Sequence, residues 1–185
     1  QHTDIGLADE INSAMPEHVV ALTARALNDV GKALRNANIV VLGVAYKEGV
    51  ADMRHSPALT IIDRLRASGA IVRYHDPHVP FFDPEQADVP AGRVVAWNDI
   101  VDRRGKRRPS DAPVHLVEAK TNGRRRIDPL ASAPLDDALL RDADCVIVAT
   151  AHREIDYRRV ARLASIVVDT RNVVPADENA RVTSL

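Results

Sequence analysis

Few aromatic residues, a single cysteine and almost no net charge set the first limits on this 185-residue chain. Aromatics make up 3% of the residues, so we expect a core built from Val, Leu, Ile and Ala. The lone cysteine excludes an internal disulfide and fits a reducing compartment, and we expect the cytoplasm. A net charge of −1 gives no reason to expect binding to nucleic acid or to a membrane surface.

Long apolar runs and signal sequences are absent as well. No apolar run approaches the roughly 20 residues that a membrane-spanning helix needs, and the amino terminus has no signal-peptide pattern. Cys145 lies in the apolar run DADCVIVAT, where a cysteine is typically a small buried hydrophobe. We therefore do not expect Cys145 to act as a nucleophile.

Apolar runs do alternate with amphipathic segments from residue 38 onward. Strands are predicted at 38–44, 70–76, 145–151 and 165–171, with a short one at 94–97, and helices at 56–69, 135–143 and 156–164. Val- and Ile-rich runs between helices indicate parallel strands that are buried on both faces. The fold class is therefore α/β, a Rossmann-like three-layer domain with a mainly parallel sheet.

A long helix precedes this domain. Apolar residues recur at helical spacing over 7–35, although Pro16 should kink the helix or begin a second one. A helix before the first strand is unusual for an α/β domain, and we interpret residues 1–36 as a connector. Residues 37–185 then form the domain.

Residues 101–130 are strongly basic. They hold nine Lys or Arg and four Asp or Glu, so this segment carries +5 and the rest of the chain −6. One interpretation is a solvated insertion, and the other is a contact with an anion or a partner. The segment has no interleaved aromatics, so we do not expect a nucleic-acid site.

Charged residues cluster where the predicted strands end. Ligands of open parallel sheets bind beyond the carboxyl ends of the strands. The segment after the first strand, GVAYKEGVADMR, offers Tyr46, Lys47 and Arg54, with Asp52 placed to orient Arg54. Lys and Arg suit phosphate groups, and a tyrosine offers a ring face and a hydroxyl. The alternative is that these are ordinary surface residues with a weak ion pair.

Other site types have less support. The loop after the first strand is too long and too poor in glycine for a dinucleotide-type phosphate turn. His75, Asp76 and His78 are close in sequence but lack further ligands, so we expect no metal site. Asp76 occupies the place of a ribose-binding acid in dinucleotide folds, which we attribute to shared architecture. His152 follows a strand end, and we assign it a structural role.

Four motifs in order give a resemblance to a known family. They are LGVAYKEGVADMRHSPALTIIDRL, GAIVRYHDPHVP, DADCVIVATAHREID and IVVDTRNV. Together they resemble the C-terminal domain of the UDP-glucose/GDP-mannose dehydrogenase family, and EINSAMPEHVV resembles its linking helix. The resemblance leaves out about 81–132, where the family domain is shorter. The motif YHDPHVP resembles the corresponding motif of bacterial enzymes that act on UDP-N-acetylhexosamines.

The resemblance implies roles for four residues. Tyr46 and Lys47 would contact the UDP part of a substrate, and Arg171 would lie near its diphosphate. Arg54 would reach the phosphates of NAD, which is bound mainly by a domain absent from this chain. Residues 7–35 would form a homodimer contact.

The family oxidises a sugar C6 alcohol twice to a carboxylate with NAD, for example in polysaccharide biosynthesis. Candidate substrates are UDP-N-acetylglucosamine, UDP-N-acetylmannosamine and UDP-glucose, and the sequence does not choose among them. The catalytic cysteine of the family has no counterpart here, so no catalytic residue is assigned and the chain alone should be inactive. The alternative is a non-catalytic nucleotide-binding or scaffolding module. The chain could also be a piece of a longer protein.

Overall fold

The computed structural model describes residues 3–82, 130–176 and 180–184, and the structural statements below concern these residues. In chain order the elements are α1 (Thr3–Asn28), β1 (Asn38–Leu42), α2 (Pro57–Ala67), β2 (Ile71–His75), β3 (Phe81–Phe82), β4 (Leu130–Ala131), α3 (Asp137–Asp142), β5 (Cys145–Val148), α4 (Tyr157–Leu163), β6 (Ile166–Asp169) and β7 (Arg181–Ser184). Five strands form one sheet in the order β2-β1-β5-β6-β7, and every neighbouring pair is parallel.

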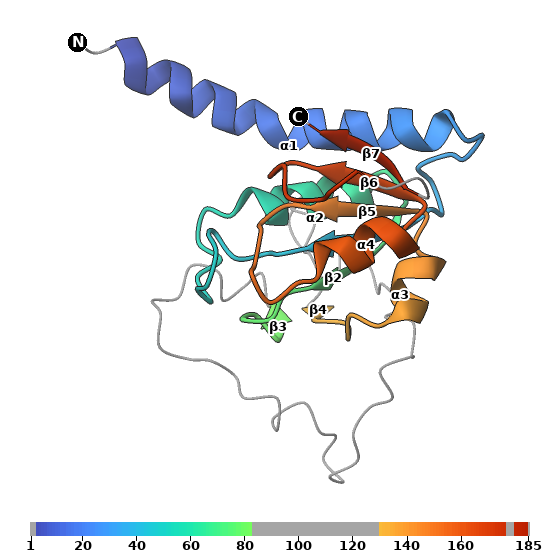
Figure 1. The fold of residues 1–185 in the computed structure, drawn as a ribbon. Helices are drawn as coiled ribbons and strands as arrows, with labels where there is room; N and C mark the ends of the chain where they lie inside the picture. Colours follow the sequence, from blue (N-terminus) through green and yellow to red (C-terminus); the bar gives the residue numbers. More distant parts are fainter. Residues whose placement is uncertain (1–2, 83–129, 177–179, 185) are drawn as a thin grey trace, which may run out of the picture.

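Helices cover both faces of this sheet, which confirms the predicted three-layer α/β architecture (Figure 1). Ile39 and Val41 of β1 belong to the apolar cluster that includes residues of α1 and α2. Val40 and Leu42 belong to the cluster that includes residues of α3 and α4. Because both faces of β1 are buried, the strand has the continuous apolar sequence that parallel sheets require.

Helix α2 has the boundaries that its sequence predicts. Ser56 caps its amino end by accepting a hydrogen bond from the Ala58 N–H at 3.3 Å, and Pro57 takes the first helical position. Gly69 follows the helix with a φ of 88°, and its N–H donates to the Arg66 carbonyl. A left-handed glycine after the last turn is a common way to end a helix.

Helix α1 ends at Asn28, seven residues before the predicted end at residue 35. Gly31 has a φ of 75°, and its N–H donates to the Asn28 carbonyl at 2.9 Å. The Lys32 N–H donates to the Leu27 carbonyl at 2.9 Å. These paired bonds satisfy the last carbonyls and turn the chain away from the helix axis.

Pro16 lies inside α1 and does not divide it into two helices. The amino-terminal half of the helix is inclined to the other half and extends past the sheet (Figure 1). Such a bend fits a proline, which removes one backbone hydrogen bond.

The carboxyl-terminal half of α1 packs into the core of the domain. Val19, Thr23 and Leu27 are buried along one face, and the Thr23 hydroxyl donates to the Val19 carbonyl at 2.8 Å. The spacing of four residues is that of one helix face. Residues 1–36 and 37–185 therefore share one core. Their division into a connector and a binding domain stays a prediction about the function of each part.

Three short strands were not predicted. β7 extends the sheet beside β6, and β3 pairs antiparallel with β4. The predicted strand 94–97 and all but the last residue of the basic segment 101–130 lie outside the described residues. None of the helices within the described ranges combines the length and the apolarity that crossing a bilayer demands.

Candidate functional site

The carboxyl ends of β1, β5 and β6 lie side by side, because these strands are parallel neighbours. The segments that follow them are 43–56, 149–156 and 170–176, and β2 adds 76–80 at the outer side of β1. All four segments were predicted to carry polar side chains to one edge of the sheet. The structure confirms that they meet there, which is the usual ligand position in this architecture.

Thr150 joins two of these segments. Its hydroxyl donates to the Ala45 carbonyl at 2.7 Å, which ties the segment after β5 to the segment after β1. Ser56 Oγ lies 3.4 Å from the same carbonyl. The loop that carries Tyr46 and Lys47 is therefore anchored at Ala45.

Asp76 is a buried carboxylate at the end of β2, with 2% of its surface exposed. Oδ2 accepts from the N–H groups of Val44 (2.7 Å) and Ala45 (3.0 Å). Oδ1 accepts from the N–H groups of His78 (2.8 Å) and Val79 (3.1 Å). The side chain thus organises its own turn and the start of the loop after β1, and this supports a structural role over ribose binding.

His152 is buried beside Asp76, with 1% of its surface exposed. Its Nε2 lies 3.1 Å from Asp76 Oδ2, and its Nδ1 accepts from the Gly49 N–H at 3.3 Å. Its backbone N–H donates to the Tyr157 hydroxyl at 2.9 Å. Burial raises the pKa of Tyr157 to about 12, so this hydroxyl stays protonated at neutral pH.

Tyr46 and Lys47 are both exposed at the edge of the sheet. Tyr46 has 53% of its surface exposed, and its N–H donates to the Asp52 carbonyl at 2.6 Å. A large exposed aromatic beside a cation offers a stacking surface and a charge to a nucleotide.

Arg54 pairs with Asp52 in the same loop. Its Nε donates to Oδ1 at 3.0 Å and its Nη2 to Oδ2 at 2.7 Å, so Asp52 orients Arg54 as predicted. These bonds lower the pKa of Asp52 to about 2. Both side chains are exposed to solvent, so the pair orients Arg54 more than it stabilises the fold.

Arg171 lies in the turn after β6. Its Nε donates to the Ala149 carbonyl at 2.7 Å. The carboxylate of Asp169 accepts from the N–H groups of Arg171, Val173 and Val174 at 2.7–2.9 Å. Asp169 thus shapes this turn, and Arg171 is exposed.

The four predicted site residues are divided between two loops. Tyr46, Lys47 and Arg54 lie after β1, and Arg171 lies after β6. Segment 149–152 lies between the two loops and contacts both, through Thr150 on one side and Ala149 on the other. The structure therefore places all four at one edge of the sheet.

Three potential metal ligands approach one another near this edge. Ligand atoms of His78, His152 and Glu154 lie within 4.8 Å of one another. His78 Nε2 is 3.1 Å from Glu154 Oε1, although without hydrogen-bond geometry. Both nitrogens of His152 are engaged with Asp76 and Gly49, so a metal would have to displace one of these bonds.

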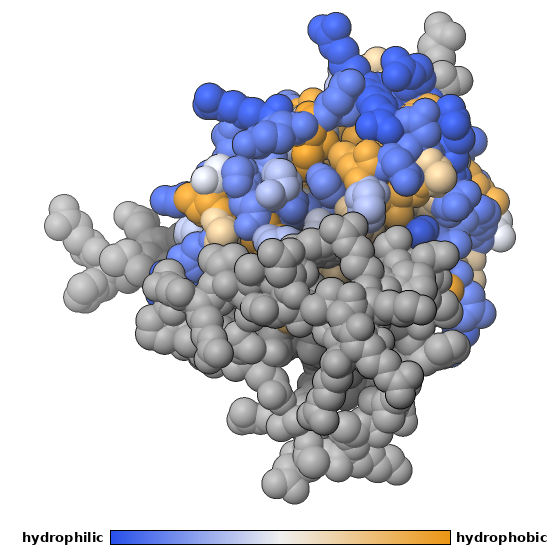
Figure 2. All heavy atoms as spheres, turned by 90° about the horizontal axis from the view of Figure 1, so that it is seen from below, coloured by the Kyte–Doolittle hydropathy of each residue, from blue (hydrophilic) through white to orange (hydrophobic). Residues whose placement is uncertain are grey.

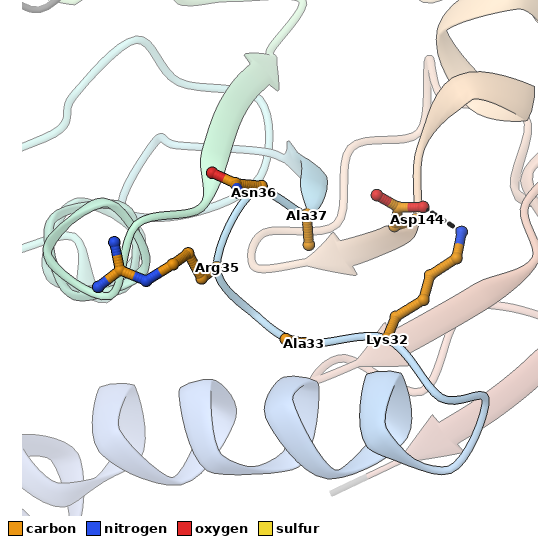
Figure 3. A pocket seen from close by; sticks show the side chains of 6 residues that line it. All are labelled: Lys32, Ala33, Arg35, Asn36, Ala37 and Asp144. Carbon is orange, nitrogen blue, oxygen red and sulfur yellow. Dashed lines mark hydrogen bonds and ion pairs between the residues drawn. The ribbon is translucent and has the colours of Figure 1, made fainter.

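A hollow of about 210 Å³ lies at the opposite edge of the sheet. It is lined by Lys32, Ala33, Arg35, Asn36, Ala37 and Asp144 (Figure 3). Lys32 forms an ion pair with Asp144, and Arg35 points away toward α2. These residues precede β1 and β5, so the hollow lies at the amino ends of the strands, where this architecture does not bind ligands.

In the view from below the molecule, hydrophilic residues make up most of the coloured surface, with smaller apolar areas between them (Figure 2). Exposed large apolar residues among the described ones are Val30, Tyr46 and Ile71. Tyr46 alone of these belongs to the loops at the candidate site.

Comparison with known proteins gives a family match over most of the chain. Residues 40–176 match the model of the UDP-glucose/GDP-mannose dehydrogenase family, UDP binding domain. A UDP-N-acetyl-D-mannosamine dehydrogenase of Pyrococcus horikoshii is 41% identical over 75 residues, which is 40% of this chain and 18% of that protein. A UDP-glucose 6-dehydrogenase of Rhizobium meliloti is 24% identical over 184 residues, 97% of this chain and 31% of that protein.

Solved structures agree on the fold. A dehydrogenase of NDP-N-acetyl-D-galactosaminuronic acid from Methanosarcina mazei matches with a TM-score of 0.62 at 20% identity, covering 96% of this chain and 30% of that one. A UDP-D-ManNAc dehydrogenase from Pyrococcus horikoshii matches with a TM-score of 0.59 at 23% identity, covering 95% and 32%. The chain thus spans less than a third of the length of these relatives.

Proposed function

Because this chain belongs to the UDP-glucose/GDP-mannose dehydrogenase family, we propose that it is the UDP-sugar-binding part of an NAD-dependent nucleotide-sugar 6-dehydrogenase. The relatives named as UDP-N-acetyl-D-mannosamine and UDP-glucose 6-dehydrogenases support a UDP-sugar as the substrate. The parent enzyme would oxidise the C6 alcohol of the sugar to a carboxylate in two steps. A location in the cytoplasm stays a prediction.

The observation that carries this proposal is the position of Lys47 and Arg171 on loops after β1 and β6, at one edge of the sheet. A UDP-sugar has a planar base and two phosphate charges. Tyr46 would stack against the base, and Lys47 and Arg171 would contact the diphosphate, Arg171 through the nitrogens that do not bind Ala149. This assignment follows the roles that the resemblance implies.

NAD would accept a hydride in each oxidation when bound to the parent enzyme. Arg54 fits a role toward its phosphates, because its side chain is 47% exposed and Asp52 holds the guanidinium in one orientation. Nη1 has no hydrogen bond among the described residues, which leaves a donor for an anion. Arg54 is therefore proposed to contact the phosphates of NAD.

The nucleophile of the parent enzyme would lie outside this chain. Cys145 has no exposed surface, and burial raises the pKa of its thiol to about 12. A protonated, inaccessible thiol cannot attack an aldehyde, so the chain alone should bind nucleotide without turnover.

We also propose that α1 forms a homodimer contact. The helix extends past the sheet at its amino-terminal end (Figure 1). Val19, Thr23 and Leu27 face the core, while Ala21 and Arg25 are exposed on another side of the helix. A projecting helix of this kind suits a second copy of the chain.

Titration calorimetry with UDP on the 185-residue chain tests the function. One charge-assisted hydrogen bond contributes about 1.5–3 kcal/mol, so Lys47→Ala and Arg171→Ala should each weaken binding about 10- to 100-fold. Lys32→Ala and Arg141→Ala are matched controls, because both residues make exposed ion pairs away from this edge. Their affinity should equal that of the wild type.

Absence of binding at millimolar UDP would overturn the assignment and leave the scaffolding module. If UDP binds, UDP-glucose, UDP-N-acetylglucosamine and UDP-N-acetylmannosamine compared in the same assay would identify the sugar.

A further inference from the structure

Asp76 and His152 form a buried polar pair beneath the loop that carries Tyr46 and Lys47. The side chains of both residues are fully buried, and their contact is 3.1 Å. Burying a polar group costs free energy unless the group is hydrogen-bonded. The hydrogen bonds of Asp76 and His152 therefore offset the cost of burying both side chains.

The hydrogen bonds define the tautomer of His152. Gly49 can only donate through its N–H, so Nδ1 of His152 must accept with its lone pair. The proton of the neutral ring then lies on Nε2 and is donated to Asp76 Oδ2. His152 therefore links a backbone N–H of the loop to the carboxylate.

The pair holds the loop on both sides of the exposed residues. Asp76 binds the N–H groups of Val44 and Ala45, which precede Tyr46. His152 binds the N–H of Gly49, which follows Lys47 by two residues. None of these N–H groups is used in the ladder between β1 and its neighbours, so the pair fixes the loop and not the sheet.

We propose that Asp76 and His152 are positioning residues, which hold residues 44–49 so that Tyr46 and Lys47 are presented to the nucleotide in one conformation. This inference rests on the proposed function. A loop held in its binding conformation loses less entropy when the ligand binds, so loosening it weakens affinity without removing any ligand contact.

The test compares three substitutions of His152 with one neighbouring control. His152→Leu keeps the bulk and removes both side-chain bonds. His152→Asn keeps an acceptor near the position of Nδ1, and His152→Gln keeps a donor near the position of Nε2. His78→Leu is the control, because it removes an imidazole whose centre is 5.1 Å from that of His152 and which makes no side-chain bond to the loop.

UDP affinity by calorimetry and amide hydrogen exchange of peptides covering residues 43–50 are the two measurements. We expect His152→Leu to lose at least tenfold in affinity and to exchange at least tenfold faster in 43–50. His152→Asn and His152→Gln should lie between His152→Leu and the wild type, and His78→Leu should stay within twofold of it. A role in packing alone gives the opposite order, because Leu fills the buried site better than either amide.

The inference is overturned if His152→Leu, folded by circular dichroism, binds UDP within twofold of the wild type. If His152→Leu does not fold, the decision passes to His152→Asn and His152→Gln, and unchanged affinity in both overturns the inference. If the wild type does not bind UDP, the proposed function fails. Faster exchange of residues 43–50 in His152→Leu would then still support the proposal that His152 holds the loop. Unchanged exchange in that variant would overturn this proposal as well.

Discussion

Gly43 lies so close to Thr150 that a Cβ built on residue 43 would be 2.2 Å from the Thr150 carbonyl oxygen. The φ of Gly43 is 78°, a conformation that other residues rarely adopt. The chain leaves β1 at this residue and immediately passes the backbone that follows β5. Glycine at position 43 is thus required both by the space and by the backbone.

We expect Gly43→Ala to destabilise the chain by ~3–5 kcal/mol in urea unfolding, because the clash is with backbone that cannot rotate away. Gly31→Ala is the matched control. Gly31 has a φ of 75° but nothing within 4 Å of its added Cβ, so it should lose only about 1–2 kcal/mol. Equal losses in the two variants would show that Thr150 is not a barrier.

Asp52 should titrate far below a normal aspartate. The hydrogen bonds from Arg54 lower its pKa to about 2 from a usual 3.8, so the paired, ionised form is fully present above pH 4. Its contribution to stability is lost as the pH falls from about 4 through about 2. Carbon NMR of the carboxyl group measures the titration.

Arg54→Gln should return the pKa of Asp52 toward 3.8 in the same NMR measurement. A wild-type value near 3.8 would mean that the pair is not formed in solution. In the full-length parent enzyme, Arg54→Gln should raise the KM for NAD.

Cys145 should be unreactive in the native chain. Burial raises the pKa of its thiol to about 12 from a usual 9, so the neutral thiol persists in the fold while the unfolded chain ionises. The contribution of this thiol to stability is therefore complete below pH 9 and falls as the pH rises from 9 through about 12. Iodoacetamide at pH 8, followed by intact mass, should label the chain in urea and leave the native chain unlabelled.

The dimer proposal is tested on the exposed side of α1. Leu22 is unsuitable for this test, because it is partly buried against the core and a charge there would also disturb folding. Ala21 is exposed, and Ala21→Glu should give a monomer by light scattering if α1 is the contact. Thr60→Glu on the exposed side of α2 places the same charge elsewhere and should keep the wild-type mass.

Local signals in the sequence account for most of the fold. Ser56, Pro57 and Gly69 mark the ends of α2, and the structure has the helix between them. The same signal at Gly31 is masked in the sequence, because Val30 and Leu34 continue the apolar spacing past the end of α1. The sequence does not predict β7, because this strand is short and none of its residues is fully buried, so it lacks the apolar run of the inner strands.

The site was less accessible to sequence reasoning. Lys47 and Arg54 could be found from their place after a predicted strand. The roles of Asp76 and His152 depend on contacts with Val44, Ala45 and Gly49, which are 31 to 103 residues away in sequence. Only the sheet order brings these three segments together, and the pattern of apolar runs along the chain does not reveal that order.

The pairing of β3 with β4 has a consequence for how the domain tolerates change. Phe82 and Leu130 are partners in this antiparallel pair, so the residues on either side of segment 83–129 lie next to each other. Sequence of almost any length can join two adjacent points without shifting the sheet. A two-residue Asn-Gly turn could join Phe82 to Leu130. We therefore expect that the segment between these two residues can be replaced by another sequence while the five-stranded sheet is retained.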